Sequence, residues 1–105
     1  MTEKIIEWNL AFTLDEVVVG VEKLLSKLGY AFSRSHAAEE EIFHATPPRG
    51  ALTCAAKPLT AYRSPFNIQV TLHRTLLTVS YSGLGEREEA LLKQQMTLAF
   101  LRVGG

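Results

Sequence analysis

The stretch that decides the fold is FNIQVTLHRTLLTVSYS, from Phe66 to Ser82, in which apolar and polar side chains alternate. Successive side chains of a β-strand point to opposite faces, so this period of two predicts strands with one apolar face and one polar face. If Arg74 and Thr75 form a two-residue turn, all the apolar residues lie on a single face. The predicted pairs are Leu72 with Leu77, Val70 with Val79, and Ile68 with Tyr81. The sequence therefore predicts a β-hairpin whose apolar face needs a cover.

Residues 14–28 predict the first helix that can provide this cover. Thr13 and Glu16 have the spacing of a capping box, and Gly29 is a natural end for a helix. Apolar residues recur at three- and four-residue steps, which is the pattern of one buried helix face. These residues are Leu14, Val17, Val18, Val21, Leu24, Leu25 and Leu28.

Residues 86–103 predict a second amphipathic helix. The segment opens with three glutamates, which suit the positive end of the helix dipole. One apolar stripe follows, and Leu91 and Leu98 widen it. The stripe consists of Leu92, Met96, Ala99, Phe100 and Val103.

Shorter alternating segments predict the remaining strands. Residues 6–12 alternate apolar with mainly polar side chains, and residues 52–57 form a strand with unusually small side chains. Small residues on a sheet face permit the close approach of a covering helix or of a ligand. Residues 35–46 favour a helix by propensity, but their alternation and the double proline that follows favour two strands, Tyr30–Ser35 and Glu40–Ala45.

The predicted order is strand, helix, four or five antiparallel strands, helix. Runs of strands bracketed by helices are typical of a two-layer α+β domain. We expect an antiparallel sheet of five or six strands with two amphipathic helices on one face. Residues 1–105 are expected to form a single domain.

The composition narrows the functional classes. Lysine and arginine total 11, as do aspartate and glutamate, so the chain lacks the basic excess that is typical of nucleic-acid binding proteins. No segment approaches the length of a membrane span, and no signal peptide is apparent. Cys54 is the single cysteine, which excludes an internal disulfide and favours the cytoplasm. We expect a protein with no cofactor that binds neither nucleic acid nor membranes.

Few residues have the spacing of a catalytic or metal site. His36, Glu40, Glu41 and His44 would offer metal ligands on one face if their segment were helical. The favoured interpretation is a solvated polar edge with two incidental histidines. Cys54 is a formal candidate nucleophile, but its alternating surroundings favour a buried structural thiol. Phosphate-binding and nucleophile-elbow motifs are absent, so no enzyme is predicted.

Arginine, lysine and tyrosine gather in the two proline-containing loops on either side of the small-residue strand. Arg49 lies in the first loop, and Lys57, Tyr62 and Arg63 belong to the second. If both loops converge at one end of the sheet, these four residues form a cationic, aromatic-edged rim for ligand binding. The alternative is scattered charge on solvated loops.

These observations favour a non-enzymatic binding or protein-interaction module that associates with itself or docks onto a partner protein. The alternative is a small-molecule binder with an apolar pocket between sheet and helices and the cationic rim at its mouth. The predicted lining of this pocket is Trp8, Phe32, Cys54, Ile68, Tyr81 and Phe100.

Overall fold

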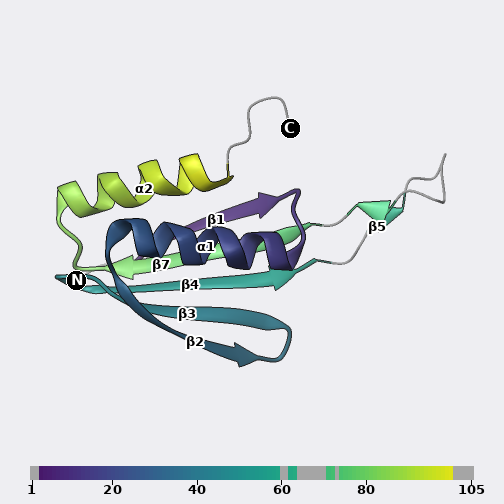
Figure 1. Cartoon of the computed structure of the whole chain (residues 1–105), viewed down its shortest axis with the longest axis horizontal. Coiled ribbons are helices and arrows are strands. Elements are labelled where there is room, and N and C mark those ends of the chain that lie inside the picture. Colours follow the sequence, from purple (N-terminus) through teal and green to yellow (C-terminus); the bar gives the residue numbers. More distant parts are fainter. Residues whose placement is uncertain (1–2, 60–61, 64–70, 73, 101–105) are drawn as a thin grey trace.

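Two helices cover one face of a five-stranded antiparallel sheet (Figure 1). The computed structural model describes residues 3–59, 62–63, 71–72 and 74–100. The elements are β1 (Lys4–Leu10), α1 (Leu14–Leu28), β2 (Ala31–Ala37), β3 (Glu40–Thr46), β4 (Ala51–Pro58), β5 (Tyr62–Arg63), β6 (Thr71–Leu72), β7 (Thr75–Ser82) and α2 (Glu86–Phe100). The main sheet has the order β1-β7-β4-β3-β2, while β5 and β6 pair with each other. The predicted two-layer α+β architecture is confirmed.

The predicted hairpin within residues 66–82 is wrong in its pairing. Leu77 lies between Trp8 of β1 and Ala56 of β4, whereas Leu72 pairs with Tyr62 of β5. Both edges of β7 are therefore occupied by long strands, which leave no edge for the chain that precedes it. Two full ladders bury more surface than one short hairpin does, so the distant partners prevail. Residues 64–70, which include Ile68 and Val70, lie outside the described part of the chain.

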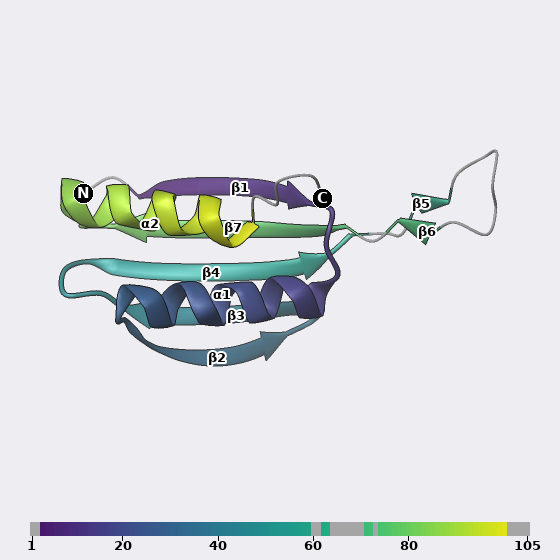
Figure 2. The same ribbon diagram turned by 45° about the horizontal axis from the view of Figure 1, so that its top comes forward.

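A longer hairpin, formed by β4 and β7, takes the place of the predicted one. Its ladder ends where Pro58 lies opposite Thr75 and the Leu59 amide donates to the Arg74 carbonyl at 2.9 Å. The short pair β5–β6 lies farther along the same two chain segments, beyond the end of the main sheet (Figure 2). These two elements thus extend away from the layer that the helices cover.

The core lies between the sheet and the helices. The side chains of β7 alternate between buried and partly exposed along its whole length, as the predicted period of two requires. Figure 2 shows α1 over β4 and β3, and α2 over β7 and β1. The largest fully buried side chains come from both layers: Val17, Val21, Leu24, Leu25, Phe43, Leu52, Leu77, Val79, Leu92 and Met96. The apolar face of the sheet is therefore covered in the predicted way.

Helix α1 begins and ends at the predicted residues. The Thr13 hydroxyl accepts from the Glu16 amide at 3.3 Å, and the Glu16 carboxylate accepts from the Thr13 amide at 3.2 Å. This capping box satisfies backbone donors that have no partner within the helix. Gly29 ends the helix with φ at 75°, a left-handed conformation that glycine adopts without a steric penalty.

The small side chains of β4 lie beneath α1. Cys54 and Ala56 are completely buried on the inner face of β4, and α1 contacts this strand. Of the two roles that the sequence left open for the small residues, the structure shows the close approach of a helix. The strand–turn–strand interpretation of residues 30–46 is likewise confirmed by β2 and β3.

Helix α2 confirms the predicted stripe only in part. Leu92, Met96 and Phe100 are buried, but Leu91 and Leu98 are exposed on the outer side of the helix. Val103 lies outside the described residues. Neither described helix is long and apolar enough to cross a membrane.

Gly50 and Gly29 provide a matched test of how the β3–β4 connection packs. Both glycines have positive φ, but a Cβ on Gly50 would overlap the Ser82 carbonyl oxygen, whereas one on Gly29 would meet nothing within 4 Å. We expect Gly29→Ala to cost about 1–2 kcal/mol from its φ alone. Gly50→Ala should cost about 3 kcal/mol or more, because the overlap adds to the same φ term. Urea unfolding of both variants measures the difference, and equal losses would contradict the packing.

Candidate interaction surface

The four predicted rim residues do not form one rim. Arg49 lies two residues before β4 and Lys57 lies near its end, so the two loops leave opposite ends of an eight-residue strand. A strand of this length spans about 25 Å, too far for the side chains to meet. Tyr62 and Arg63 belong to β5, beyond the same end of β4 as Lys57. The condition for a single rim, that both loops converge at one end of the sheet, is therefore not met by Arg49 and Lys57.

Arg49 instead lies against the beginning of α2. Its guanidinium Nη2 is 3.9 Å from a carboxylate oxygen of Glu88, and a Cβ on Gly85 would stand 2.8 Å from the same nitrogen. The Arg49 side chain is largely exposed, so this ion pair contributes little to stability. Arg49 therefore contacts the first turn of α2 and lies far from Lys57.

The candidate metal ligands are divided between the two faces of the sheet. Because β2 and β3 pair antiparallel, His36 lies opposite Glu41, on the face that carries the helices. Glu40 and His44 alternate with Glu41 and Phe43 along β3 and therefore point to the other face. No group of three potential ligands forms among the described residues. The four-residue periodicity of the set would have required a helix, and the segment is a strand hairpin.

Glu41 is nevertheless the centre of a small ion-pair cluster. Arg34 Nε donates to one carboxylate oxygen at 3.1 Å, and His36 Nδ1 lies 3.0 Å from the other. The hydrogen bond from Arg34, more than the contact with His36, lowers the pKa of the Glu41 carboxyl below its usual range. The Arg34 guanidinium also lies over the Phe43 ring, 5.6 Å from its centre. The cluster joins the edge strand β2 to β3.

Cys54 is enclosed by the core. Its side chain is completely buried, and this burial raises the pKa of the thiol to about 12. A thiol with so high a pKa stays protonated at neutral pH, so it is a poor nucleophile. The structure thus places Cys54 where the sequence favoured it, as a small apolar side chain beneath α1.

The predicted pocket is reduced to a groove between β1 and α2. Trp8 and Phe100 meet edge to face, with their ring centres 6.3 Å apart. They line a groove of about 470 Å³ together with Leu10 and Thr97. Two other predicted lining residues, Cys54 and Tyr81, are buried in the core, and Ile68 lies outside the described residues.

Glu89 fastens α2 to the sheet. One of its carboxylate oxygens accepts from Lys4 Nζ at 2.8 Å and from the Tyr81 hydroxyl at 2.9 Å. The hydrogen bond from Lys4, followed by that from Tyr81, lowers the pKa of Glu89. Burial, with the Glu89 contact second, raises the pKa of Tyr81 to about 12. One carboxylate therefore joins β1, β7 and α2, which is a structural role.

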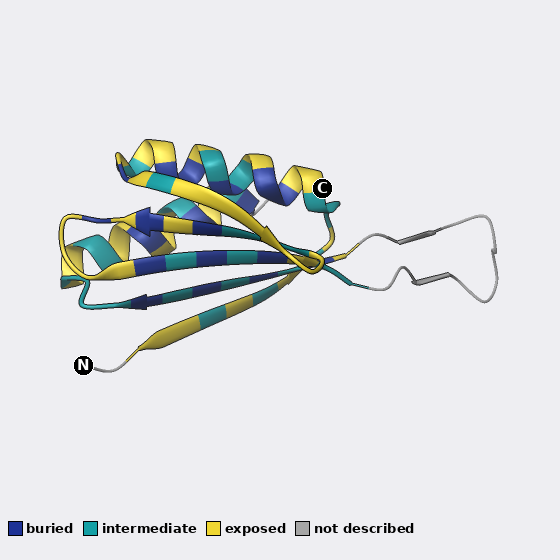
Figure 3. Ribbon diagram, turned by 90° about the horizontal axis from the view of Figure 1, so that it is seen from below, coloured by how far each residue is buried: buried dark blue, intermediate teal, exposed yellow. Residues whose placement is uncertain are grey.

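The face of the sheet opposite the helices has no covering element among the described residues. In Figure 3, which views the molecule from below, β4 and β7 alternate between buried and intermediate residues while β2 is almost entirely exposed. The outward side chains of the three central strands are small or uncharged over most of their length. They are Thr78, Ser80 and Ser82 of β7, Ala51, Thr53 and Ala55 of β4, and Ile42, His44 and Thr46 of β3, with Leu76 at one end.

We call this surface the open face. Glu40 and Lys57 are the charged residues of its central strands, and both lie at the end nearest β5 and β6. Glu7 and the exposed Ile5 extend the open face onto the edge strand β1. The middle of the open face is thus free of formal charge, which distinguishes it from an ordinary solvated sheet face.

Sequence reasoning did not identify the residues of the open face, although their signal is present in the sequence. The polar positions of the alternating segments 51–57 and 76–82 are almost all threonine, serine or alanine rather than charged residues. This choice becomes informative only once β4 and β7 are known to be neighbours.

Comparisons with known proteins add little to this description. No protein-family model matches the chain, and the comparison with curated proteins found no match. Among solved structures, the chain is similar to the crystal structure of DR_A0006 from Deinococcus radiodurans, with 7% identity, 95% of each chain covered and a TM-score of 0.35. This score is too low to carry an argument about fold or function.

The Glu41 cluster predicts an acid-sensitive part of the stability. A carboxyl whose pKa is lowered by folding stabilises the fold above its unfolded pKa, and this contribution is lost as the pH falls through the folded pKa. We expect Glu41→Gln to be less stable than the parent at neutral pH and to converge with it in acid. Glu40→Gln, on the opposite face, is the control and should leave the pH profile unchanged. Urea unfolding at a series of pH values measures both, and parallel curves for Glu41→Gln and the parent would refute the role of the cluster.

Proposed function

We propose that this protein is a non-enzymatic interaction module that associates with a second copy of itself through the open face. One observation supports this most strongly, namely the continuous surface of mainly small side chains across β7, β4 and β3, whose middle carries no formal charge. The centres of protein interfaces are depleted in charged residues, and small side chains allow two sheets to pack closely. A cover for this surface is then supplied by the partner.

The size of the open face suits a dimer. Five strands at about 4.8 Å spacing and eight residues at about 3.4 Å each give roughly 650 Å² per copy. Two copies would bury about 1,300 Å², which falls within the range of specific protein interfaces, near its lower end. The proposed dimer is consequently a modest one, and its association depends on concentration.

The charge pattern favours a second copy over a different partner. In a two-fold symmetric interface the same surface meets itself, so any cluster of like charge at its centre would repel its own image. The centre of the open face carries no such cluster, and Glu40 and Lys57 at its end have opposite signs. The surface is therefore compatible with itself.

A second candidate function is supported by the contact between Trp8 and Phe100. These two residues come together in an open groove with one apolar wall and a few polar groups, Glu7 and Asn9 among them. Such a lining fits a small aromatic ligand. The cationic rim once expected for this pocket is not part of the groove, since Arg49 lies against α2.

Trp8 is the single tryptophan and reports directly on this second candidate. Indole derivatives without overlapping fluorescence, such as nitroindole, should quench Trp8 in a saturable way if the groove binds them. Thr97→Arg, which places a long side chain across the groove, should abolish saturation, and Ser26→Arg on the outer side of α1 should not. Quenching that rises linearly with concentration would exclude this function.

Charge placement at Ser80 tests the dimer. Ser80 lies near the centre of the open face, so Ser80→Arg and Ser80→Asp each set like charges against one another in a self-associated pair. We expect each variant to weaken the dimer by about tenfold or more, as measured by sedimentation over a micromolar to sub-millimolar series. Mixing the two variants should restore association, because opposite charges then face one another.

Ser26→Arg is the matched control, since Ser26 is exposed on the outer side of α1. This variant should associate as the parent does. A monomeric parent over the whole series would overturn the proposal, as would a Ser80→Arg chain that dimerises normally. Circular dichroism of each variant shows that the fold is intact.

A further inference from the structure

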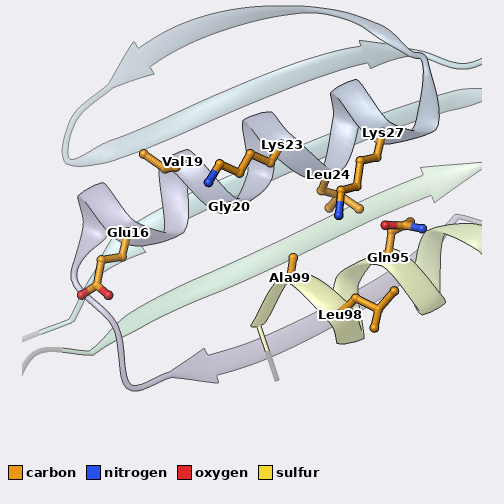
Figure 4. Close-up of a pocket in the computed structure, with 9 residues that line it drawn as sticks. All are labelled: Glu16, Val19, Gly20, Lys23, Leu24, Lys27, Gln95, Leu98 and Ala99. Atoms are coloured by element: carbon orange, nitrogen blue, oxygen red, sulfur yellow. The ribbon is translucent and has the colours of Figure 1, made fainter. Parts of the chain in front are cut away.

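A groove runs along the outer side of the molecule, between α1 and α2 (Figure 4). It has a volume of about 270 Å³, and its α1 wall carries Glu16, Val19, Gly20, Lys23, Leu24 and Lys27. Gln95, Leu98 and Ala99 of α2 form the opposite wall. The two helices approach each other closely at Gly20, where the Phe100 ring packs so near that a Cβ on Gly20 would stand 2.7 Å from its Cε1.

The groove continues toward the beginning of α2. A second hollow of about 290 Å³ shares Lys27 and Gln95 with the first and adds Leu91 and Arg87. The two hollows thus follow most of the length of both helices, which have 15 residues each and span about 22 Å. A helical ligand that fills the whole groove is about four turns long.

The rims of the groove are apolar and exposed. Val19 is 48% exposed, Leu91 40% and Leu98 63%, and these are three of the four exposed large hydrophobic residues in the described part of the chain. Leu91 and Leu98 are seven residues apart, so they lie on one side of α2, two turns from each other. The sequence alone had assigned both to the buried stripe. Their exposure along one groove marks a surface that a partner can cover.

The charges beside the groove are mainly positive. Lys23 and Lys27 point along the α1 wall (Figure 4), and neither has an ion-pair partner among the described residues. Arg87 adds a third cation in the second hollow. Of the acidic neighbours, Glu16 is engaged by Thr13 in the capping box and Glu88 by Arg49 at 3.9 Å, while Glu22 lies beside Lys23 and Lys27 on the outer side of α1. The walls of the two hollows therefore carry more cations than anions, next to exposed leucine and valine.

We infer that this groove binds an acidic amphipathic helix of a partner protein. A helix laid between α1 and α2 would insert apolar side chains at positions i, i+3 or i+4 and i+7 between Val19, Leu91 and Leu98. Glutamate or aspartate beside that stripe would meet Lys23 and Lys27. Burying the leucines supplies affinity, and the lysines select acidic sequences and fix the orientation of the helix.

The shape of the surface favours a helix over an anionic membrane. The apolar residues line the walls of a groove, whereas a peripheral membrane protein inserts apolar residues that protrude from its surface. Three cations are also fewer than the clusters that hold proteins to anionic lipids. The groove lies on the helix layer, opposite the open face, so helix binding and self-association occupy separate surfaces.

A pair of synthetic peptides tests the inference. One is a labelled 15-residue peptide with leucines at i, i+4, i+7 and i+11 and glutamates beside them, and the other carries lysine in place of each glutamate. Fluorescence anisotropy with the full chain should show saturable binding of the acidic peptide, weakened by salt, and none of the lysine peptide. Lys23→Glu should lower the affinity for the acidic peptide by about tenfold. Leu98→Gln should also lower this affinity, but the acidic peptide should still bind better than the lysine peptide.

Lys57→Glu is the matched control, because it makes the same charge reversal away from the groove, and it should bind as the parent does. The Ser80→Arg chain should also bind the acidic peptide unchanged, which separates this result from the dimer. The inference is overturned if both peptides bind equally or neither binds, or if Lys57→Glu weakens binding as much as Lys23→Glu. Binding to phosphatidylserine vesicles without binding to the acidic peptide would overturn it too.

Discussion

The pairing of β7 on both of its edges is the constraint on which the rest of the structure depends. Every residue from Thr75 to Tyr81 has a partner in both β1 and β4. Because β7 is central, its inward side chains must be covered by something other than strands, and Leu77 and Val79 are fully buried. Thr75, the one buried polar residue among those described, donates its hydroxyl to the Phe12 carbonyl at 2.8 Å and ties β7 to the connection that leads into α1.

The helices satisfy this requirement on one side only. Cys54 and Ala56 let α1 pack close to β4, while Glu89 holds α2 through Lys4 and Tyr81. Gly20 lets the Phe100 ring approach α1, which joins the helices into one layer. Neither helix reaches the other side of the sheet, so the covering that buries β7 also creates the open face. In the proposed dimer, a second copy covers the face of the sheet that the two helices leave uncovered in the single chain.

Local patterns in the sequence predicted the helices and strands well, but they did not predict which strands pair with each other. The period of three and four in residues 14–28, with Thr13 and Gly29 at its ends, defined α1 completely because a helix depends on neighbours in the chain. Strand partners are not encoded in this way. Pairing Leu77 with Leu72 or with Ala56 places its side chain on the same apolar face, so the alternation alone does not distinguish the two partners. Only the energy of the whole sheet determines which pairing forms. The predicted rim of Arg49 and Lys57 depended on the relative position of two loops, which local patterns do not encode either.

The neutral net charge of the chain conceals a separation of charge between its two sides. The 11 cationic and 11 acidic residues balance, yet the centre of the open face has no formal charge and the helix groove has an excess of cations. Association through an uncharged sheet face depends on buried area and responds weakly to salt. Binding of an acidic partner to Lys23 and Lys27 weakens as salt is added, because salt screens the attraction between the charges. Overall composition, which argued against nucleic-acid binding, could not detect this separation of charge. An even balance excludes a molecule that is basic throughout, but it is compatible with one groove rich in cations, because acidic residues such as Glu41 and Glu89 lie elsewhere and make contacts within the fold.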